Sequence, residues 1–148
     1  MNFFTQLGQN EPLMCAALSW LIAQIIKTVL HLLVEKKLDA RRLVGMGGMP
    51  SSHTAFVFSL CLMMGLQEGF SSPAFAVSFA LAAVVIYDAM GVRRETGKQG
   101  AVINRIVRSV LIEGKHITEE NLKELVGHTP LEVLGGIILA IIMVIVMA

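Results

Sequence analysis

The feature that most constrains this chain is a set of four long apolar segments. They cover roughly residues 12–34, 52–69, 73–90 and 131–148. An α-helix rises ~1.5 Å per residue, so the ~30 Å hydrocarbon core of a membrane needs about 20 mostly apolar residues per crossing. The second segment comes closest to failing this requirement. Because lipid cannot satisfy backbone amides, and because no segment alternates in polarity, we expect helices rather than a barrel.

The composition also indicates a membrane protein. Hydrophobic residues make up 55% of the 148-residue chain and the mean hydropathy is +0.70, which exceeds what a soluble core needs. The net charge of +1 creates no field that would draw nucleic acid. Cys15 and Cys61 lie in apolar runs without neighbouring ligands, which favours neither a zinc site nor a disulfide framework. We therefore predict an all-α, polytopic membrane bundle of about four transmembrane helices in one domain, residues 1–148.

The basic residues predict the orientation of the bundle. Four of the twelve follow the first segment, within residues 36–42, and seven follow the third, within residues 93–123. An even number of crossings separates these stretches, so the positive-inside rule places both in the cytosol and both termini outside. The expected location is a prokaryotic plasma membrane. In the cytosolic loop 91–130, apolar residues at helical spacing predict an amphipathic helix that lies on anionic lipid or, alternatively, helps to bind the substrate: Ile103, Ile106, Val107, Val110 and Leu111.

The twelfth basic residue, Lys27, lies inside the first apolar segment. A charge within an apolar helix costs about 3 kcal/mol on insertion scales, and it usually marks a function or a buried partner. Asp88, at the end of the third segment, is the candidate partner for an ion pair. Lys27 therefore predicts either a structural ion pair or a functional site.

Polar residues from every segment are predicted to gather at the cytosolic face. The starts of the second and fourth segments and the end of the third lie at this depth, and Lys27 can extend toward it by snorkelling. Two helix N-termini, two histidines and several cations at one membrane face suit a phosphate group. The residues concerned are Lys27, Ser51, Ser52, His53, Asp88, Arg93, Arg94, His128 and Glu132.

Simpler explanations exist for several of these residues. Ser51 or Ser52 could be only the N-cap of the second helix. The run Thr129-Pro130-Leu131-Glu132 has the pattern of a capping box with proline at the first helical position, although a histidine could still donate a hydrogen bond to the glutamate. The two arginines, Arg93 and Arg94, could be ordinary positive-inside anchors.

Three motifs carry a family resemblance. Pro50-Ser51-Ser52-His53 resembles the Pro-Ser-Gly-His signature of the type 2 phosphatidic acid phosphatase superfamily, which includes the vanadium-dependent haloperoxidases. The longer runs at residues 47–54, 87–94 and 127–133 are similar to the divergent branch of that superfamily, over nearly the whole chain.

The resemblance implies a set of roles and no metal or cofactor. His128 would attack phosphorus, Glu132 would orient it and His53 would protonate the leaving oxygen. Lys27, Ser51 and Arg94 or Arg93 would hold the phosphate oxygens, with Ser52 beside them and Asp88 in support. The chain departs from the superfamily pattern because Ser52 replaces glycine, Glu132 replaces aspartate and a long loop separates Arg94 from His128. Four crossings rather than six leave room for a homodimer that completes the bundle.

Three hypotheses follow from these residues. The first is a metal-independent, membrane-embedded phosphatase that hydrolyses a lipid phosphate or diphosphate through a phosphohistidine on His128, with soluble phosphate esters still open as substrates. The second is a non-catalytic binder or carrier of anionic lipid, which would need Lys27 and the arginines but tolerate loss of His128. The third is a structural membrane subunit in which Lys27 and Asp88 form a buried ion pair. The expected partners are membrane lipid and a phosphorylated amphiphile.

Overall fold

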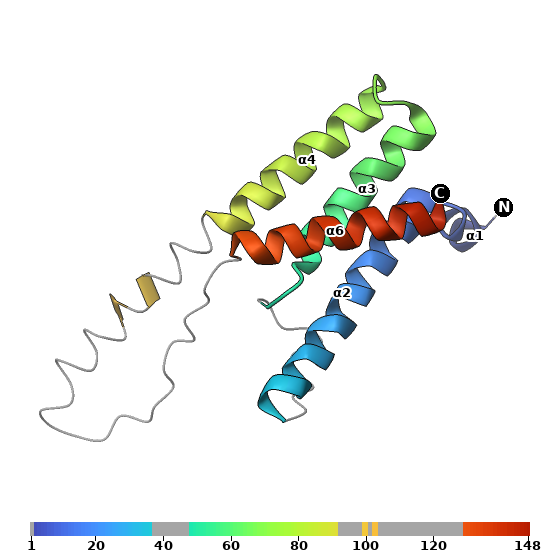
Figure 1. Ribbon diagram of the computed structural model, residues 1–148. Coiled ribbons are helices and arrows are strands. Elements are labelled where there is room, and N and C mark those ends of the chain that lie inside the picture. Colours follow the sequence, from blue (N-terminus) through green and yellow to red (C-terminus); the bar gives the residue numbers. More distant parts are fainter. Residues whose placement is uncertain (1, 37–47, 92–98, 101, 104–128) are drawn as a thin grey trace, which may run out of the picture.

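The described part of the protein is a bundle of helices (Figure 1). The computed structural model describes residues 2–36, 48–91, 99–100, 102–103 and 129–148, and these contain no strand. Four helices begin and end within one residue of the predicted segments, which confirms the all-α bundle. A short helix, α1, precedes them and was not predicted. The helices are α1 (Phe3–Gly8), α2 (Glu11–Glu35), α3 (Ser52–Glu68), α4 (Pro73–Met90) and α6 (Pro130–Met147).

Short polar side chains fix where the helices begin. At α2, the side chain of Asn10 accepts a hydrogen bond from the Leu13 amide at 3.0 Å. At α4, Ser72 accepts from the Phe75 amide at 3.1 Å. A proline in the first two positions of α2, α4 and α6 is preorganised for the helix and lacks an amide that would need a partner. These caps matter in lipid, where water does not satisfy the first amides of a helix.

Helix α3 lies at the centre of the bundle and packs against α2, α4 and α6. Buried residues are accordingly spread along its whole length. One apolar cluster joins α3 to α2 and α6, and a second joins it to α4. The first includes Cys15, Ala55, Met63, Leu139 and Met143, and the second includes Val57, Cys61 and Ala82.

Three of the described helices are long and apolar enough to cross a membrane, namely residues Glu11–Leu33 of α2, all of α4 and all of α6. Helix α3 has 17 residues, or about 26 Å at 1.5 Å per residue, and falls short of that length. A cap at Ser51 and a glycine at Gly69 set its two ends. Because α3 is enclosed by its neighbours, it presents less surface to lipid, and the predicted fourth crossing stays a prediction.

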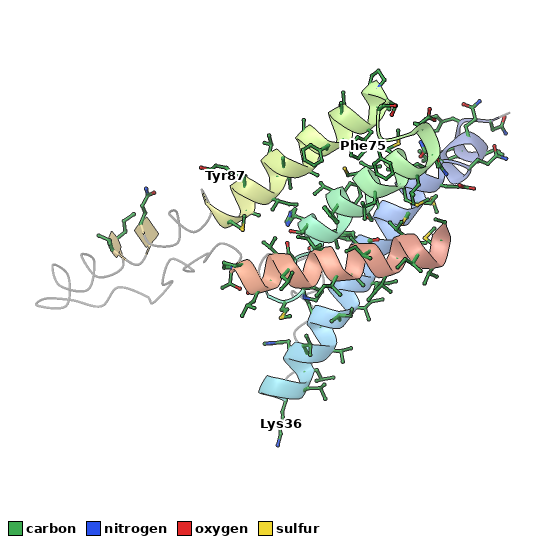
Figure 2. All side chains as sticks on the ribbon, turned by 45° about the horizontal axis from the view of Figure 1, so that its top comes forward. Lys36, Phe75 and Tyr87 are labelled. Atoms are coloured by element: carbon green, nitrogen blue, oxygen red, sulfur yellow. The ribbon has the colours of Figure 1, made fainter. Side chains whose placement is uncertain are left out.

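The directions of the helices bring their polar ends to one side of the bundle. The C-terminal ends of α2 and α4 and the N-terminal ends of α3 and α6 lie toward the same side, whereas the chain termini lie together at the other (Figure 1). Large apolar side chains project outward along the helices, and Tyr87 and Lys36 mark the polar side (Figure 2). The fold therefore places together the starts of α3 and α6, where the sequence predicted the site.

Candidate functional site

The centre of the candidate site is a hydrogen bond between α2 and α3. The ammonium of Lys27 donates to the hydroxyl of Ser52 at 3.1 Å. Both side chains are buried, with exposed fractions of 7% and 2%. Gly48, at a φ of 85°, lies against the lysine stem, since a Cβ there would be 4.0 Å from Lys27 Cγ. The turn before α3 therefore covers a buried cation at the first turn of that helix.

Ser51 is the N-cap of α3. The sequence had predicted that either Ser51 or Ser52 could have this role. Its hydroxyl accepts from the Thr54 amide at 3.3 Å and from the Thr54 hydroxyl at 3.0 Å. The Ser51 side chain is fully buried. His53 lies in the same first turn and is half-buried. The first-turn amides of a helix carry partial positive charge, so the end of α3 adds to the field of Lys27.

Helix α6 meets the start of α3 backbone to backbone. The Ser51 amide donates to the Glu132 carbonyl at 2.8 Å. A Cβ on Gly136 would lie 2.6 Å from the Ser51 carbonyl oxygen and 2.8 Å from Thr54 Cβ, so only glycine fits without a shift. Gly136 was not among the residues predicted from the sequence. The available signal was the pair Gly135 and Gly136 in an aliphatic helix, because small residues are typical where membrane helices pack closely.

Glu132 joins the start of α6 to the lysine. Its carboxylate accepts from the Thr129 amide at 3.2 Å, and its own amide donates to the Thr129 hydroxyl at 3.3 Å. This is the predicted capping box. The carboxylate also interacts electrostatically with Lys27. Glu132 is therefore both a capping residue and part of the charge environment of the buried ammonium.

The structure brings together predicted residues from three helices: Lys27 on α2, the Ser51–His53 turn on α3 and Glu132 on α6. Asp88, the predicted partner of Lys27, is half-buried in the last turn of α4. The structure gives the lysine Ser52 as a hydrogen-bond partner and Glu132 as an electrostatic partner. His128, Arg93, Arg94 and most of the predicted loop helix lie outside the described residues.

Lys27, Ser52 and the first-turn amides of α3 are groups of the kind that bind anions. An ammonium has three donors, and the hydrogen bond to Ser52 uses one of them. Ser52 is a neutral acceptor and does not offset the charge of Lys27, whereas the Glu132 carboxylate offsets part of it. Within the described residues, no three His, Cys, Asp or Glu side chains are grouped closely enough to hold a metal ion.

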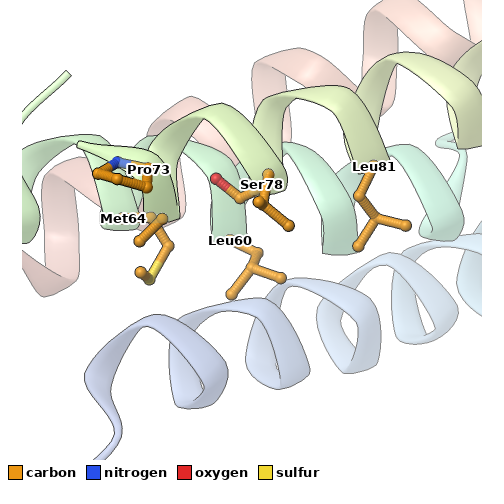
Figure 3. A pocket seen from close by; sticks show the side chains of 7 residues that line it. Leu60, Met64, Pro73, Ser78 and Leu81 are labelled. Carbon is orange, nitrogen blue, oxygen red and sulfur yellow. The ribbon is translucent and has the colours of Figure 1, made fainter. Parts of the chain in front are cut away.

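A groove lies away from these residues, between α3 and α4 near the turn that joins them (Figure 3). It has a volume of about 480 Å³ and is an open groove with an almost entirely apolar lining. Its residues on α3 lie beyond the first two turns of that helix, so the groove is separate from the Lys27–Ser52 pair. The lining residues are Leu60, Met64, Pro73, Ala74, Val77, Ser78 and Leu81.

Comparison with known proteins gives one family and one curated relative. The divergent PAP2 family matches residues 8–143, which include every residue of the site. The relative is "Uncharacterized membrane protein YuiD" of Bacillus subtilis (strain 168), which is 37% identical over 153 residues. That alignment covers 97% of this chain and 97% of the relative. No solved structure gives a significant match.

Proposed function

The chain belongs to the divergent PAP2 family, and we propose that it is a membrane-embedded phosphatase that hydrolyses a lipid phosphate or diphosphate. The observation that carries this proposal is the hydrogen bond from Lys27 to Ser52 at the first turn of α3. Burying an ammonium between helices costs free energy, so a buried lysine usually marks a function or a partner. A helix N-terminus, a cation and the adjacent His53 are the groups that bind a phosphoryl group and help it transfer.

In the proposed reaction, the imidazole of His128 attacks phosphorus. The bond from phosphorus to the leaving oxygen breaks, and His53 donates a proton to that oxygen. Water then gives a proton to His53 and attacks the phosphohistidine, the bond from phosphorus to nitrogen breaks, and inorganic phosphate and the free imidazole are released. Lys27, with Arg93 and Arg94, stabilises charge on the transferring oxygens, and Glu132 orients His128. No step uses a metal ion or cofactor.

The location of the site favours a lipid substrate. Ser52 lies at the start of α3, and Lys27 lies about two turns before the C-terminal end of α2. The outer surfaces of these helices are apolar, so the site is expected near the membrane interface. A phosphorylated amphiphile can keep its tails in the bilayer while its headgroup reaches the cations. The substrate class proposed here is therefore a lipid mono- or diphosphate.

We place the site on the cytosolic side, with both chain termini outside, because the basic residues follow α2 and α4. Single cysteines introduced at Lys36 and at Asn2, in a chain whose own Cys15 and Cys61 are replaced by alanine, test this orientation. A membrane-impermeant maleimide added to intact cells is expected to label position 2 and not position 36. The opposite pattern would reverse the assignment.

Phosphate release by the purified protein in detergent tests the activity. The panel contains lipid monophosphates, lipid diphosphates and a soluble phosphate ester, each assayed with wild type, His128→Ala, His53→Ala and the control His31→Ala. Loss of the nucleophile is expected to abolish turnover, and loss of the proton donor to lower kcat by about 10²–10⁴-fold. His31→Ala is expected to retain it, since His31 lies on α2 and has no proposed role.

One outcome would reject the mechanism and another would reject the activity. Equal phosphate release by wild type and His128→Ala would exclude the phosphohistidine on His128. Binding of the lipid phosphates by both proteins without any release would favour the alternative of a non-catalytic binder, which needs Lys27 but not His128.

A further inference from the structure

One turn of α6 holds the backbone of Ser51 at two points. The Ser51 amide donates to the Glu132 carbonyl at 2.8 Å, and the Ser51 carbonyl faces Gly136, where a Cβ would come within 2.6 Å. Residues four apart lie on the same face of a helix, one turn from each other. We call this arrangement of Ser51, Glu132 and Gly136 the backbone clamp.

The clamp requires glycine at position 136 more strictly than at its neighbour. The atoms that an alanine would meet at Gly136 are the Ser51 carbonyl oxygen and Thr54 Cβ, both fixed by the first turn of α3. An alanine at Gly135 would meet the end of the flexible Met49 side chain at 3.2 Å and Pro50 Cβ at 3.3 Å. Alanine at position 136 must therefore move α6, whereas alanine at position 135 is largely accommodated by a side chain.

We propose that Gly136 is a positioning residue, and that the backbone clamp aligns the start of α6 with the Lys27–Ser52 pair. This inference rests on the proposed function. In the sequence, His128 directly precedes Thr129, the N-cap of α6, so the proposed nucleophile is covalently joined to the start of this helix. The hydrogen bond between Lys27 and Ser52 joins α2 to α3 and includes no group of α6, although Glu132 of α6 also acts on the lysine charge. Attack on phosphorus should therefore be more sensitive to the clamp than phosphate binding is.

Steady-state kinetics separate these two steps. Gly136→Ala is expected to lower kcat by about 10–100-fold, because misplacement by about 1 Å can cost that much, while KM stays within about twofold. The inhibition constant of inorganic phosphate, as a probe of the Lys27 end, should also stay within about twofold. The matched control, Gly135→Ala, should resemble wild type in all three. A wild-type kcat in Gly136→Ala, or a loss in Gly135→Ala of equal size, would overturn the proposal.

Amide hydrogen exchange tests the clamp without relying on turnover. The Ser51 amide is bonded to Glu132, so it should exchange slowly in wild type and in Gly135→Ala, and at least about tenfold faster in Gly136→Ala. If Gly136→Ala does not fold, the wild-type protein alone serves, because the clamp predicts that its Ser51 amide exchanges as slowly as the amides within α3. Unchanged Ser51 exchange would disprove the clamp.

The two measurements also separate this proposal from the proposed function. Faster exchange together with a lower kcat supports both. Faster exchange with normal kcat leaves the phosphatase standing and rejects Gly136 as a positioning residue. Faster exchange in a protein whose wild type releases no phosphate rejects the phosphatase, and the positioning role falls with it.

Discussion

At each end of the bundle, a polar hydrogen bond joins α2 to α3, but the two bonds differ in charge and burial. At the site end, a polar link between Lys27 and Ser52 joins α2 to α3. At the opposite end, Gln67 on α3 donates a hydrogen bond to the carboxylate of Glu11 on α2. These two links lie about 15 residues apart along each helix, and they hold α2 and α3 antiparallel.

Glycines allow close approach at both ends as well. A Cβ on Gly65 would lie 2.5 Å from the ring of Phe70, which follows the α3 helix, and one on Gly136 would lie 2.6 Å from the Ser51 carbonyl. The first contact is to a side chain, and the second is to backbone. Glu11 and Gln67 are exposed, whereas Lys27 and Ser52 are buried. Holding two helices together needs neither a buried charge nor a backbone contact, so the site end has features beyond those that packing requires.

The largest expected difference between the two ends comes from removing each polar link. Lys27→Met keeps the length of the side chain and removes the charge, and it is expected to lower kcat/KM by about 10²–10³-fold through lost charge stabilisation. The midpoint of thermal unfolding should change little, because the desolvation cost of the ammonium is removed together with its contacts to Ser52 and Glu132. Gln67→Ala should change turnover by less than about twofold, since exposed polar links contribute little. Phosphate release and thermal unfolding in the same detergent measure both effects.

An equal loss of turnover in Lys27→Met and Gln67→Ala would contradict the proposed difference between the two ends. So would a loss of activity in Lys27→Met that matched the loss of folded protein, because Lys27 would then be a structural residue like Gln67.

The helix ends could be read from the sequence because the signals are local. A cap residue, a following proline and an apolar run of set length decide where a helix begins, as in Ser72 with Pro73 and Thr129 with Pro130. Helix α1 was missed because six residues are too few to show a helical period. The capping box of Thr129 and Glu132 was predicted correctly for the same local reason.

The contacts within the site depend on which helices meet, and the sequence does not encode this locally. Lys27 donates a hydrogen bond to Ser52, the residue that replaces the superfamily glycine, and no local pattern in the sequence predicted this contact. Gly136 was overlooked because its role appears only when α6 lies against Ser51. Both results show that a substitution within a motif has to be judged by its neighbour across the bundle.

The smallest expected difference between the two ends concerns the helix caps. Thr129 caps α6 at the site end, and Ser72 caps α4 at the opposite end, each by accepting a hydrogen bond from a backbone amide. Thr129→Ala and Ser72→Ala should each lower the free energy of unfolding by about 1 kcal/mol. Only Thr129→Ala should also lower kcat, by about 2–10-fold, because its capping box holds Glu132 and it directly follows His128. Thr129→Ser, which restores the cap, should restore kcat. If instead both alanine variants lost stability and activity in the same proportion, the start of α6 would have no role beyond that of any other helix end.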